Sequence, residues 1–247
     1  MKNPERYERQ IMLKEIGKKG QKKLAEAKIL VCGAGGLGSP AIIYLAAAGT
    51  GTIGICDFDD INISNLNRQI LYGKNDAGKK KTQKAKNFIK KFNPETKINI
   101  FNKKLSRSNI DRILNGYDAV LDATDNFDTR FLINSAAYKN GIALISGAVR
   151  EFEGIVMTTV PEEKTACFNC VYPFKPAAEK ASGITGAVCG VIGSLQALEA
   201  VKYVLNLETL KNKLLIYSAL ENSFRIKNLI KRIECPVCGN NFSSSAP

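Results

Sequence analysis

Polar and charged side chains follow several apolar segments of this chain, and their types suit chemistry on phosphate groups. Arg68 and Lys81 could neutralise a polyphosphate as pyrophosphate leaves, and Asp125 could hold Mg²⁺. The residues of this set are Asp57, Asp59, Ser64, Asn65, Leu66, Asn67, Arg68, Lys81, Asp125 and Asn126. Together they predict phosphoryl chemistry at the carboxyl ends of strands, where ligands bind in doubly wound sheets.

Each of these residues alone has an ordinary structural interpretation. Lys81 alone would be a solvated lysine, and Arg68 alone would form a surface ion pair. Asp125 and Asn126 alone would form a turn at a strand end or cap a helix. Only the joint occurrence of these residue types favours a site.

A glycine-rich turn precedes this set. Directly after the apolar residues 29–32, the G-x-G-x-x-G pattern is formed by Gly33, Gly35 and Gly38, with a further glycine at Gly36. Glycines let the backbone approach a phosphate closely, and the following helix N-terminus offers free N–H groups. Asp57 lies nineteen residues after Gly38, where a carboxylate would bind a ribose hydroxyl. The pattern predicts a nucleotide site; the alternative is a purely structural turn.

The same turn occurs in nicotinamide- and flavin-dependent oxidoreductases, but the rest of the chain argues against hydride transfer. Such enzymes need a hydride-transfer site in a second domain, commonly with a proton-relay residue such as histidine. The chain has no histidine. This absence also excludes Ser-His-Asp triads, Cys-His dyads and histidine-ligated metals.

Four of the seven cysteines form two C-x-x-C pairs, which are Cys167 with Cys170 and Cys235 with Cys238. Zn²⁺ prefers four thiolates in a tetrahedron, and each pair presents two sulfurs from a tight turn. The pairs predict a closed, structural zinc site, with redox dithiols or unliganded cysteines as the alternatives. Cys32 and Cys56 lie in apolar segments and are expected to be buried.

Apolar runs alternate with segments of helical period. This alternation predicts an α/β fold: a Rossmann-like, doubly wound, mostly parallel sheet with helices on both faces. The predicted parallel strands are residues 29–32, 52–56, 98–101, 119–123 and 142–146. Residues 191–205 have helical spacing, and the predicted antiparallel strands are residues 154–160, 213–217 and 224–230.

The organisation of the chain indicates one domain over residues 1–247. We expect N-terminal helices at 1–26, a long loop at 161–188 and a cysteine-bearing tail at 235–247. Because long loops inside a domain are usually functional or mobile, the loop is a candidate lid or partner crossover.

Composition favours a soluble, cytoplasmic protein without membrane contact. The chain is 45% hydrophobic and 24% charged, its first residues are polar, and an odd number of cysteines argues against a disulfide framework. The longest apolar run, residues 41–48, is far shorter than the ~20 residues that span a bilayer. The formal net charge of +13 comes mostly from lysines. No nucleic-acid-binding module is recognisable, so nucleic acid is not the expected partner.

Six strings, in order along nearly the whole chain, resemble the ThiF/MoeB/HesA family of ubiquitin-activating-like adenylyltransferases. They are RYERQ (6–10), GAGGLGSP (33–40), AAAGTGTIGICDFDDINISNLNRQ (46–69), LDATDNFDTR (121–130), SGAVREFEG (146–154) and GVIGSLQALEA (190–200).

This resemblance implies an ATP site made by Gly36, Asp57, the Ser64 to Arg68 run, Lys81, Asp125 and Asn126. It implies that a terminal glycine carboxylate attacks the α-phosphate, giving an acyl-adenylate and pyrophosphate. The implied substrate is a ubiquitin-like sulfur-carrier protein of the MoaD or ThiS type with a Gly-Gly C-terminus, which serves molybdopterin, thiamin or tRNA thiolation.

The resemblance also implies a homodimer in which Arg9 reaches the partner's ATP site; the alternative for Arg9 is a capping ion pair. Zinc-bearing members carry cysteines where the two pairs stand here. Some members have a further cysteine in the crossover loop that links covalently to the carrier. That position falls near Glu179, where this chain has no cysteine. Cys189 is the nearest candidate, but it enters an apolar helix and is expected to be buried.

Two other functions stay open. A related enzyme could adenylate a tRNA base or a ribosomal peptide, bound by the lysine-rich surface. A nucleotide sensor or scaffold would require a degenerate ATP set, whereas this set is complete. The paired cysteines favour the carrier, because tRNA-dehydrating relatives generally lack them.

Overall fold

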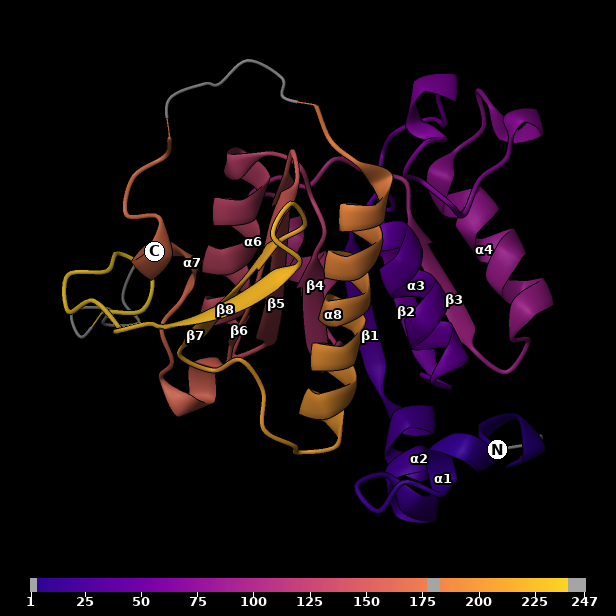
Figure 1. Ribbon diagram of the computed structural model, residues 1–247, viewed down its shortest axis with the longest axis horizontal. Coiled ribbons are helices and arrows are strands. Elements are labelled where there is room, and N and C mark those ends of the chain that lie inside the picture. The colour runs from indigo at the N-terminus through magenta and orange to yellow at the C-terminus, as the bar shows by residue number, and fades with distance from the viewer. Residues whose placement is uncertain (1–3, 177–182, 240–247) are drawn as a thin grey trace.

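One sheet organises the structure, a computed structural model that describes residues 4–176 and 183–239. In these residues eight strands lie in the order β3-β2-β1-β4-β5-β6-β7-β8 (Figure 1). The apolar, β-branched runs that predicted strands are central and buried: β1 has one exposed residue at its start and four buried ones after it. The predicted Rossmann-like α/β fold is confirmed.

The first five strands are parallel. They are β1 (Lys28–Cys32), β2 (Thr52–Cys56), β3 (Lys97–Phe101), β4 (Ala119–Asp122) and β5 (Ala143–Arg150). Cys32 pairs in register with both Cys56 and Asp122. The carboxyl ends of β1, β2 and β4 therefore meet at one edge of the sheet.

The last strands are antiparallel, as predicted. They are β6 (Glu153–Thr159), β7 (Lys213–Ser218) and β8 (Ser223–Asn228). The fifth strand continues to Arg150, beyond the predicted end at residue 146, because it turns directly into β6 and Arg150 pairs with Glu153.

Helices cover both faces of the sheet. One face packs against α3 (Gly38–Ala47), α4 (Lys81–Phe92) and α8 (Gly186–Val204). The other packs against α5 (Ile110–Leu114) and α6 (Phe127–Lys139). Short 3-10 helices, η2 (Ile63–Asn65) and η3 (Lys74–Asp76), lie between β2 and α4.

The N-terminal helices predicted for residues 1–26 are present as η1 (Pro4–Tyr7), α1 (Glu8–Ile11) and α2 (Gly17–Glu26). The Tyr7 hydroxyl accepts a hydrogen bond from Nδ2 of the buried Asn93, at 2.8 Å. This contact attaches the N-terminal segment to the end of α4.

The predicted loop at residues 161–188 is partly wrong. It contains η4 (Pro161–Glu163) and α7 (Phe168–Val171), and α8 begins at Gly186 rather than at residue 191. Helix α7 forms because Phe168 is buried among the aromatic rings of α6. Local periodicity could not predict a helix that depends on this distant contact.

Helix α8 is, by length and composition, the one helix among the described residues that could cross a membrane. However, it packs against α3, β5 and β6. Its Glu199 is buried, and that carboxylate accepts hydrogen bonds from Thr158 Oγ1 and Leu210 N, each at 2.7 Å. These contacts are those of a core helix.

Candidate active site

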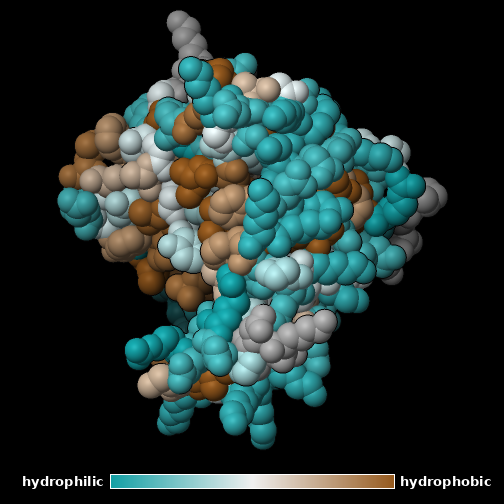
Figure 2. Space-filling view, turned by 90° about the vertical axis from the view of Figure 1, so that its right-hand side faces the viewer, coloured by the Kyte–Doolittle hydropathy of each residue, from teal (hydrophilic) through white to brown (hydrophobic). Residues whose placement is uncertain are grey.

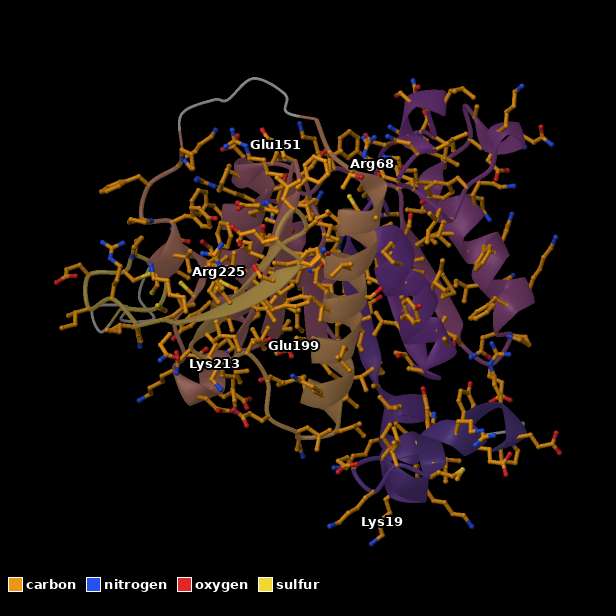
Figure 3. All side chains as sticks on the ribbon, in the orientation of Figure 1. Lys19, Arg68, Glu151, Glu199, Lys213 and Arg225 are labelled. Atoms are coloured by element: carbon orange, nitrogen blue, oxygen red, sulfur yellow. The ribbon has the colours of Figure 1, made fainter. Side chains whose placement is uncertain are left out.

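A cleft opens at the carboxyl edge of the parallel strands, on the side of the molecule where Arg68 lies (Figure 3). Nine of the predicted site residues line it: Gly33, Gly35, Gly36, Asp57, Asp59, Arg68, Lys81, Asp125 and Asn126. We call it the sheet-edge cleft. The structure thus brings together residues that lie more than ninety positions apart in the sequence.

The glycine turn lines the cleft. Two of its positions, Gly33 and Gly38, have no room for a side chain. Gly33 has φ +97°, and a Cβ there would lie 2.6 Å from the Ala123 carbonyl oxygen. A Cβ on Gly38 would lie 1.9 Å from the Gly33 carbonyl oxygen. Tyr72 donates a hydrogen bond to the Ala34 carbonyl at 2.7 Å. The turn is thereby held at the N-terminus of α3, whose N–H groups suit an anion.

Asp57 holds this turn from the end of β2. Its carboxylate accepts hydrogen bonds from the backbone N–H of Ala34, at 2.7 Å, and of Asp59, at 2.8 Å. Burial raises the pKa of Asp57 above its usual 3.8, while the Lys81 charge and the two N–H donors act in the opposite direction. Because a carboxylate oxygen accepts more than one hydrogen bond, Asp57 can still accept one from a ribose hydroxyl.

Lys81 stands in a run of lysines, residues 79–81, but it is not solvated. It starts α4, is only 4% exposed, and its Nζ lies 2.8 Å from Asp59 Oδ2. The neighbouring Lys80 instead pairs with Asp60 near the surface. Burial and the ion pair with Asp59 hold the Lys81 ammonium group at the cleft wall.

Arg68 reaches the cleft from the turn after η2. Its Nη1 donates to the Ser64 carbonyl at 3.2 Å and to Asn67 Oδ1 at 3.0 Å. The four residues before Arg68, predicted as nucleotide contacts, are not part of the cleft wall. They form the capped turn that carries Arg68, in which Asn62 Oδ1 accepts from Ser64 N at 3.0 Å.

Asp125 and Asn126 lie between β4 and α6. Asn126 is the N-cap of α6, with its side chain accepting from Thr129 N at 2.9 Å. Asn126 also donates to Asp125 Oδ1 at 3.4 Å. The capping interpretation and a place in the cleft are therefore both correct, and the Asp125 carboxylate is exposed.

The sequence interpretation missed three basic residues of the cleft wall: Lys103, Lys104 and Arg130. The two lysines follow β3. The expectation that ligands bind at the carboxyl ends of strands, which applied to Asp57, would therefore have indicated them too. Arg130 is buried and donates to the Gly147 carbonyl at 2.6 Å and to the Thr124 carbonyl. No local pattern separates such an arginine from an exposed one on the same helix.

Arg9 lies outside the cleft of its own chain. It is exposed on α1, and this helix lies at the opposite end of the molecule from Arg68 (Figures 1 and 3). Within one chain Arg9 therefore cannot contact a ligand in the sheet-edge cleft.

The two cysteine pairs form one cluster. The Sγ atoms of Cys167, Cys170, Cys235 and Cys238 all lie within 4.8 Å of one another. Sulfurs bound at ~2.3 Å to one tetrahedral centre stand about 3.8 Å apart. The Cys167–Cys235 and Cys170–Cys238 sulfur distances are 3.6 and 3.3 Å. The donor set is thus compatible with Zn²⁺ and joins the start of α7 to the C-terminal tail.

Comparison with known proteins decides the family of the chain. The model of the ThiF family matches residues 7–237. The chain belongs to the ThiF family.

Relatives of this ThiF-family chain are named adenylyltransferases. The sulfur carrier protein adenylyltransferase of Thermus thermophilus is 40% identical over 248 residues, covering 96% of this chain and 91% of that protein. The sulfur carrier protein ThiS adenylyltransferase of Escherichia coli is 36% identical, covering 96% and 95%. The adenylyltransferase and sulfurtransferase MOCS3 of Culex quinquefasciatus is 40% identical, but the chain spans only 55% of its length.

Among solved structures, E. coli MccB has a TM-score of 0.85 and 24% identity to the ThiF-family chain, covering 98% of this chain and 74% of that one. At this identity the likeness shows the fold alone.

Cys189 is buried, as predicted for this ThiF-family chain, with 1% exposure. Burial raises the pKa of its thiol, and the Arg68 charge opposes this effect. It also lines the cleft, since a Cβ on Gly36 would lie 2.9 Å from Cys189 Sγ. The crossover position near Glu179 lies outside the described residues.

Proposed function

We propose that the chain uses ATP to adenylate the C-terminal glycine carboxylate of a ubiquitin-like sulfur-carrier protein of the MoaD or ThiS type. One observation carries this proposal: a glycine turn at a helix N-terminus shares one cleft with Arg68, Lys81 and Asp125. Such a cleft suits charge neutralisation at a polyphosphate and needs no side-chain nucleophile. The carrier would then serve molybdopterin, thiamin or tRNA thiolation.

In this proposal each cleft residue has a role at the nucleotide. Asp57 binds the ribose, and the glycine turn, with Gly36 at its centre, receives the phosphates. Arg68 and Lys81 neutralise the charge that develops on pyrophosphate as it leaves. Asp125 holds Mg²⁺, with Asn126 beside it. The carboxylate is held in line with the α-phosphate, so positioning carries the remainder of the catalysis.

The names of the relatives support a carrier protein as substrate. The Thermus and E. coli proteins are called sulfur carrier protein and ThiS adenylyltransferases, and both match this chain over most of their length. Adenylation of a tRNA base or of a ribosomal peptide is the alternative that the experiment below must exclude.

We further propose that residues 1–247 act as one adenylation domain in the cytoplasm, with structural Zn²⁺ in the cysteine cluster. We also propose a homodimer in which Arg9 reaches the partner's cleft. Two observations support the dimer: Arg9 lies far from the cleft of its own chain, and α3 and α8 expose Tyr44 and Leu198 by 56% and 52%. Figure 2 shows hydrophobic residues gathered on one side of a face that is otherwise largely hydrophilic.

Exchange of labelled pyrophosphate into ATP tests the function. We expect exchange only with a Gly-Gly-ended carrier, not with carrier lacking these glycines, tRNA or a ribosomal peptide. Arg68→Ala should lower the exchange rate about a hundredfold or more, with a free energy of unfolding within about 0.5 kcal/mol of wild type. Arg112→Ala, an exposed arginine on α5, is the matched control and should leave exchange unchanged. Exchange with tRNA or peptide but no carrier would refute the proposal.

A further inference from the structure

A stripe of four side chains runs along α6 from the sheet-edge cleft to the cysteine cluster. Asn126, the N-cap of α6, and Arg130, Asn134 and Tyr138 within the helix are spaced four residues apart, so each side chain lies about one turn from the next along the helix. The first two line the cleft. The last two contact the cysteines or the residues beside them. We call these four residues the α6 stripe.

At the cleft end, the stripe fixes the first turns of the helix. Asn126 caps α6 and stands beside Asp125. Arg130 donates to the carbonyl groups of Thr124 and Gly147. The position of the cleft wall between β4 and α6 therefore follows the position of α6.

At the cluster end, both polar atoms of the Asn134 amide form hydrogen bonds with the segment that contains Cys167. It is fully buried, and its Nδ2 donates to Asn169 Oδ1 at 2.9 Å and to Cys167 Sγ at 3.5 Å. Its Oδ1 accepts from the backbone N–H of Phe168 at 3.1 Å. Tyr138 packs against the cysteine cluster one turn further on.

Helix α7, which starts directly after Cys167, also packs against the start of α6. The ring centroids of Phe127 and Tyr172 lie 5.4 Å apart, and those of Phe131 and Phe168 lie 5.6 Å apart. Figure 1 shows α7 beside α6. A metal ion that holds Cys167 and Cys170 thus holds the segment that packs along the first turns of α6.

We propose that Zn²⁺ in the cysteine cluster and ATP in the sheet-edge cleft stabilise each other's binding through α6, with Asn134 as the positioning residue. An α-helix is a rigid element, so anchoring its middle to the metal-held segment restricts the turn that carries Asn126. Because coupling between two sites is reciprocal, bound ATP must raise the affinity for zinc by the same factor by which zinc raises the affinity for ATP. This inference rests on the proposed zinc and ATP sites but not on the identity of the carrier.

The equilibrium affinity for zinc, measured by competition with a chromogenic chelator with and without saturating ATP and Mg²⁺, tests the coupling in the full-length protein. We expect ATP to raise the zinc affinity about fivefold, at the lower end of typical coupling. In Asn134→Leu the ratio of the two affinities should approach one. Lys81→Ala, at the same ATP concentration, should also have a ratio near one, which excludes a direct effect of ATP on zinc or on the chelator.

Asn93→Leu is the matched control, because Asn93 is also a buried asparagine that uses both amide atoms, donating to Tyr7 Oη and to the Ala46 carbonyl and accepting from Glu95 N. It should keep the wild-type ratio. A wild-type ratio of one, or an unchanged ratio in Asn134→Leu, overturns the inference.

Hydrogen exchange on the wild-type protein gives a test that needs no variant. Zinc removal should speed exchange at residues 127–131, and unchanged exchange there would overturn the inference even if Asn134→Leu failed to fold. Purified protein without stoichiometric zinc would refute the zinc site and this coupling together. Failure of every carrier in pyrophosphate exchange would refute the proposed function alone.

Discussion

At the scale of single residues, the cleft depends on charges held in place by backbone donors and by one another. Asp57 supports the glycine turn through Ala34 N, and Asp59 fixes the buried Lys81 ammonium group. Removing one residue of such a pair leaves the other without its hydrogen bond or ion pair. The residue-level consequences are therefore electrostatic and depend on pH.

The raised pKa of Asp57 gives a pH-dependent prediction. As pH rises above about 3.8, the carboxyl ionises in the unfolded chain before it does so in the folded one. Wild type should therefore lose free energy of unfolding relative to Asp57→Asn until the folded pKa is passed, after which the difference is constant. Urea unfolding of both proteins between pH 3.5 and 7 measures this difference. A difference that grows in favour of wild type with rising pH would show that the folded pKa is lowered instead.

The sequence predicted which residue types meet in the cleft but not how each is buried. The expectation that ligands bind at the carboxyl ends of strands placed Asp57 and Asp125 at one sheet edge, and Lys81, at a helix start, was added to them by its charge. It could not separate Lys81, which is 4% exposed, from the exposed Lys80 beside it, because that depends on how α4 packs. Arg130 was missed for the same reason.

At the scale of elements, strands were predicted well because a buried parallel strand is a short apolar run whatever its neighbours are. Helix α7 and the early start of α8 were missed. The former depends on aromatic contacts with α6, and the latter on Gly186, whose Cβ would lie 2.2 Å from the Asn67 carbonyl oxygen. Both are contacts between distant segments that local periodicity does not contain.

The turn between β1 and α3 should tolerate no side chain at Gly38. An added Cβ would lie 1.9 Å from the Gly33 carbonyl oxygen, so Gly38→Ala must move the turn. We expect a loss of about 1–3 kcal/mol in the free energy of unfolding and markedly weaker ATP binding, measured by denaturation and calorimetry. Gly73→Ala is the control, because nothing lies within 4 Å of its added Cβ. Wild-type ATP affinity in Gly38→Ala would contradict this account of the turn.

The cysteine cluster should contribute to stability through its metal. Cys170→Ser removes one of the four sulfurs, and we expect it to lose zinc and about 4 kcal/mol or more of unfolding free energy. Metal analysis and chemical denaturation measure both quantities. Cys56→Ala, at a buried cysteine outside the cluster, should keep the full zinc content. Zinc content equal to wild type in Cys170→Ser would exclude the four-cysteine site.

At the scale of the whole molecule, one chain leaves two features unexplained. Helix α1, which carries Arg9, lies at the opposite end of the molecule from the cleft, and α3 and α8 expose Tyr44 and Leu198. The homodimer was expected only from the resemblance to a family. The sequence pattern of an apolar helix face is the same whether the core or a second subunit covers that face.

Complementation between subunits tests the shared site. Arg9→Ala and Arg68→Ala should each lower the rate of pyrophosphate exchange about a hundredfold or more. In an equimolar mixture that exchanges subunits freely, half of the dimers carry one intact site of two, so about a quarter of the wild-type rate should return. Sedimentation of differently tagged subunits verifies that mixed dimers form. Mixed dimers without any recovered activity would place Arg9 outside the partner's cleft.

The most direct measurement is the intact mass of a Gly-Gly-ended carrier after incubation with the protein, ATP and Mg²⁺, together with the released products. We expect the carrier to gain the mass of one adenylyl group at its terminal glycine, with one pyrophosphate released and no ADP. A carrier of unchanged mass with ATP converted to ADP and phosphate, or an adenylyl group found elsewhere on the carrier, would contradict carboxylate activation.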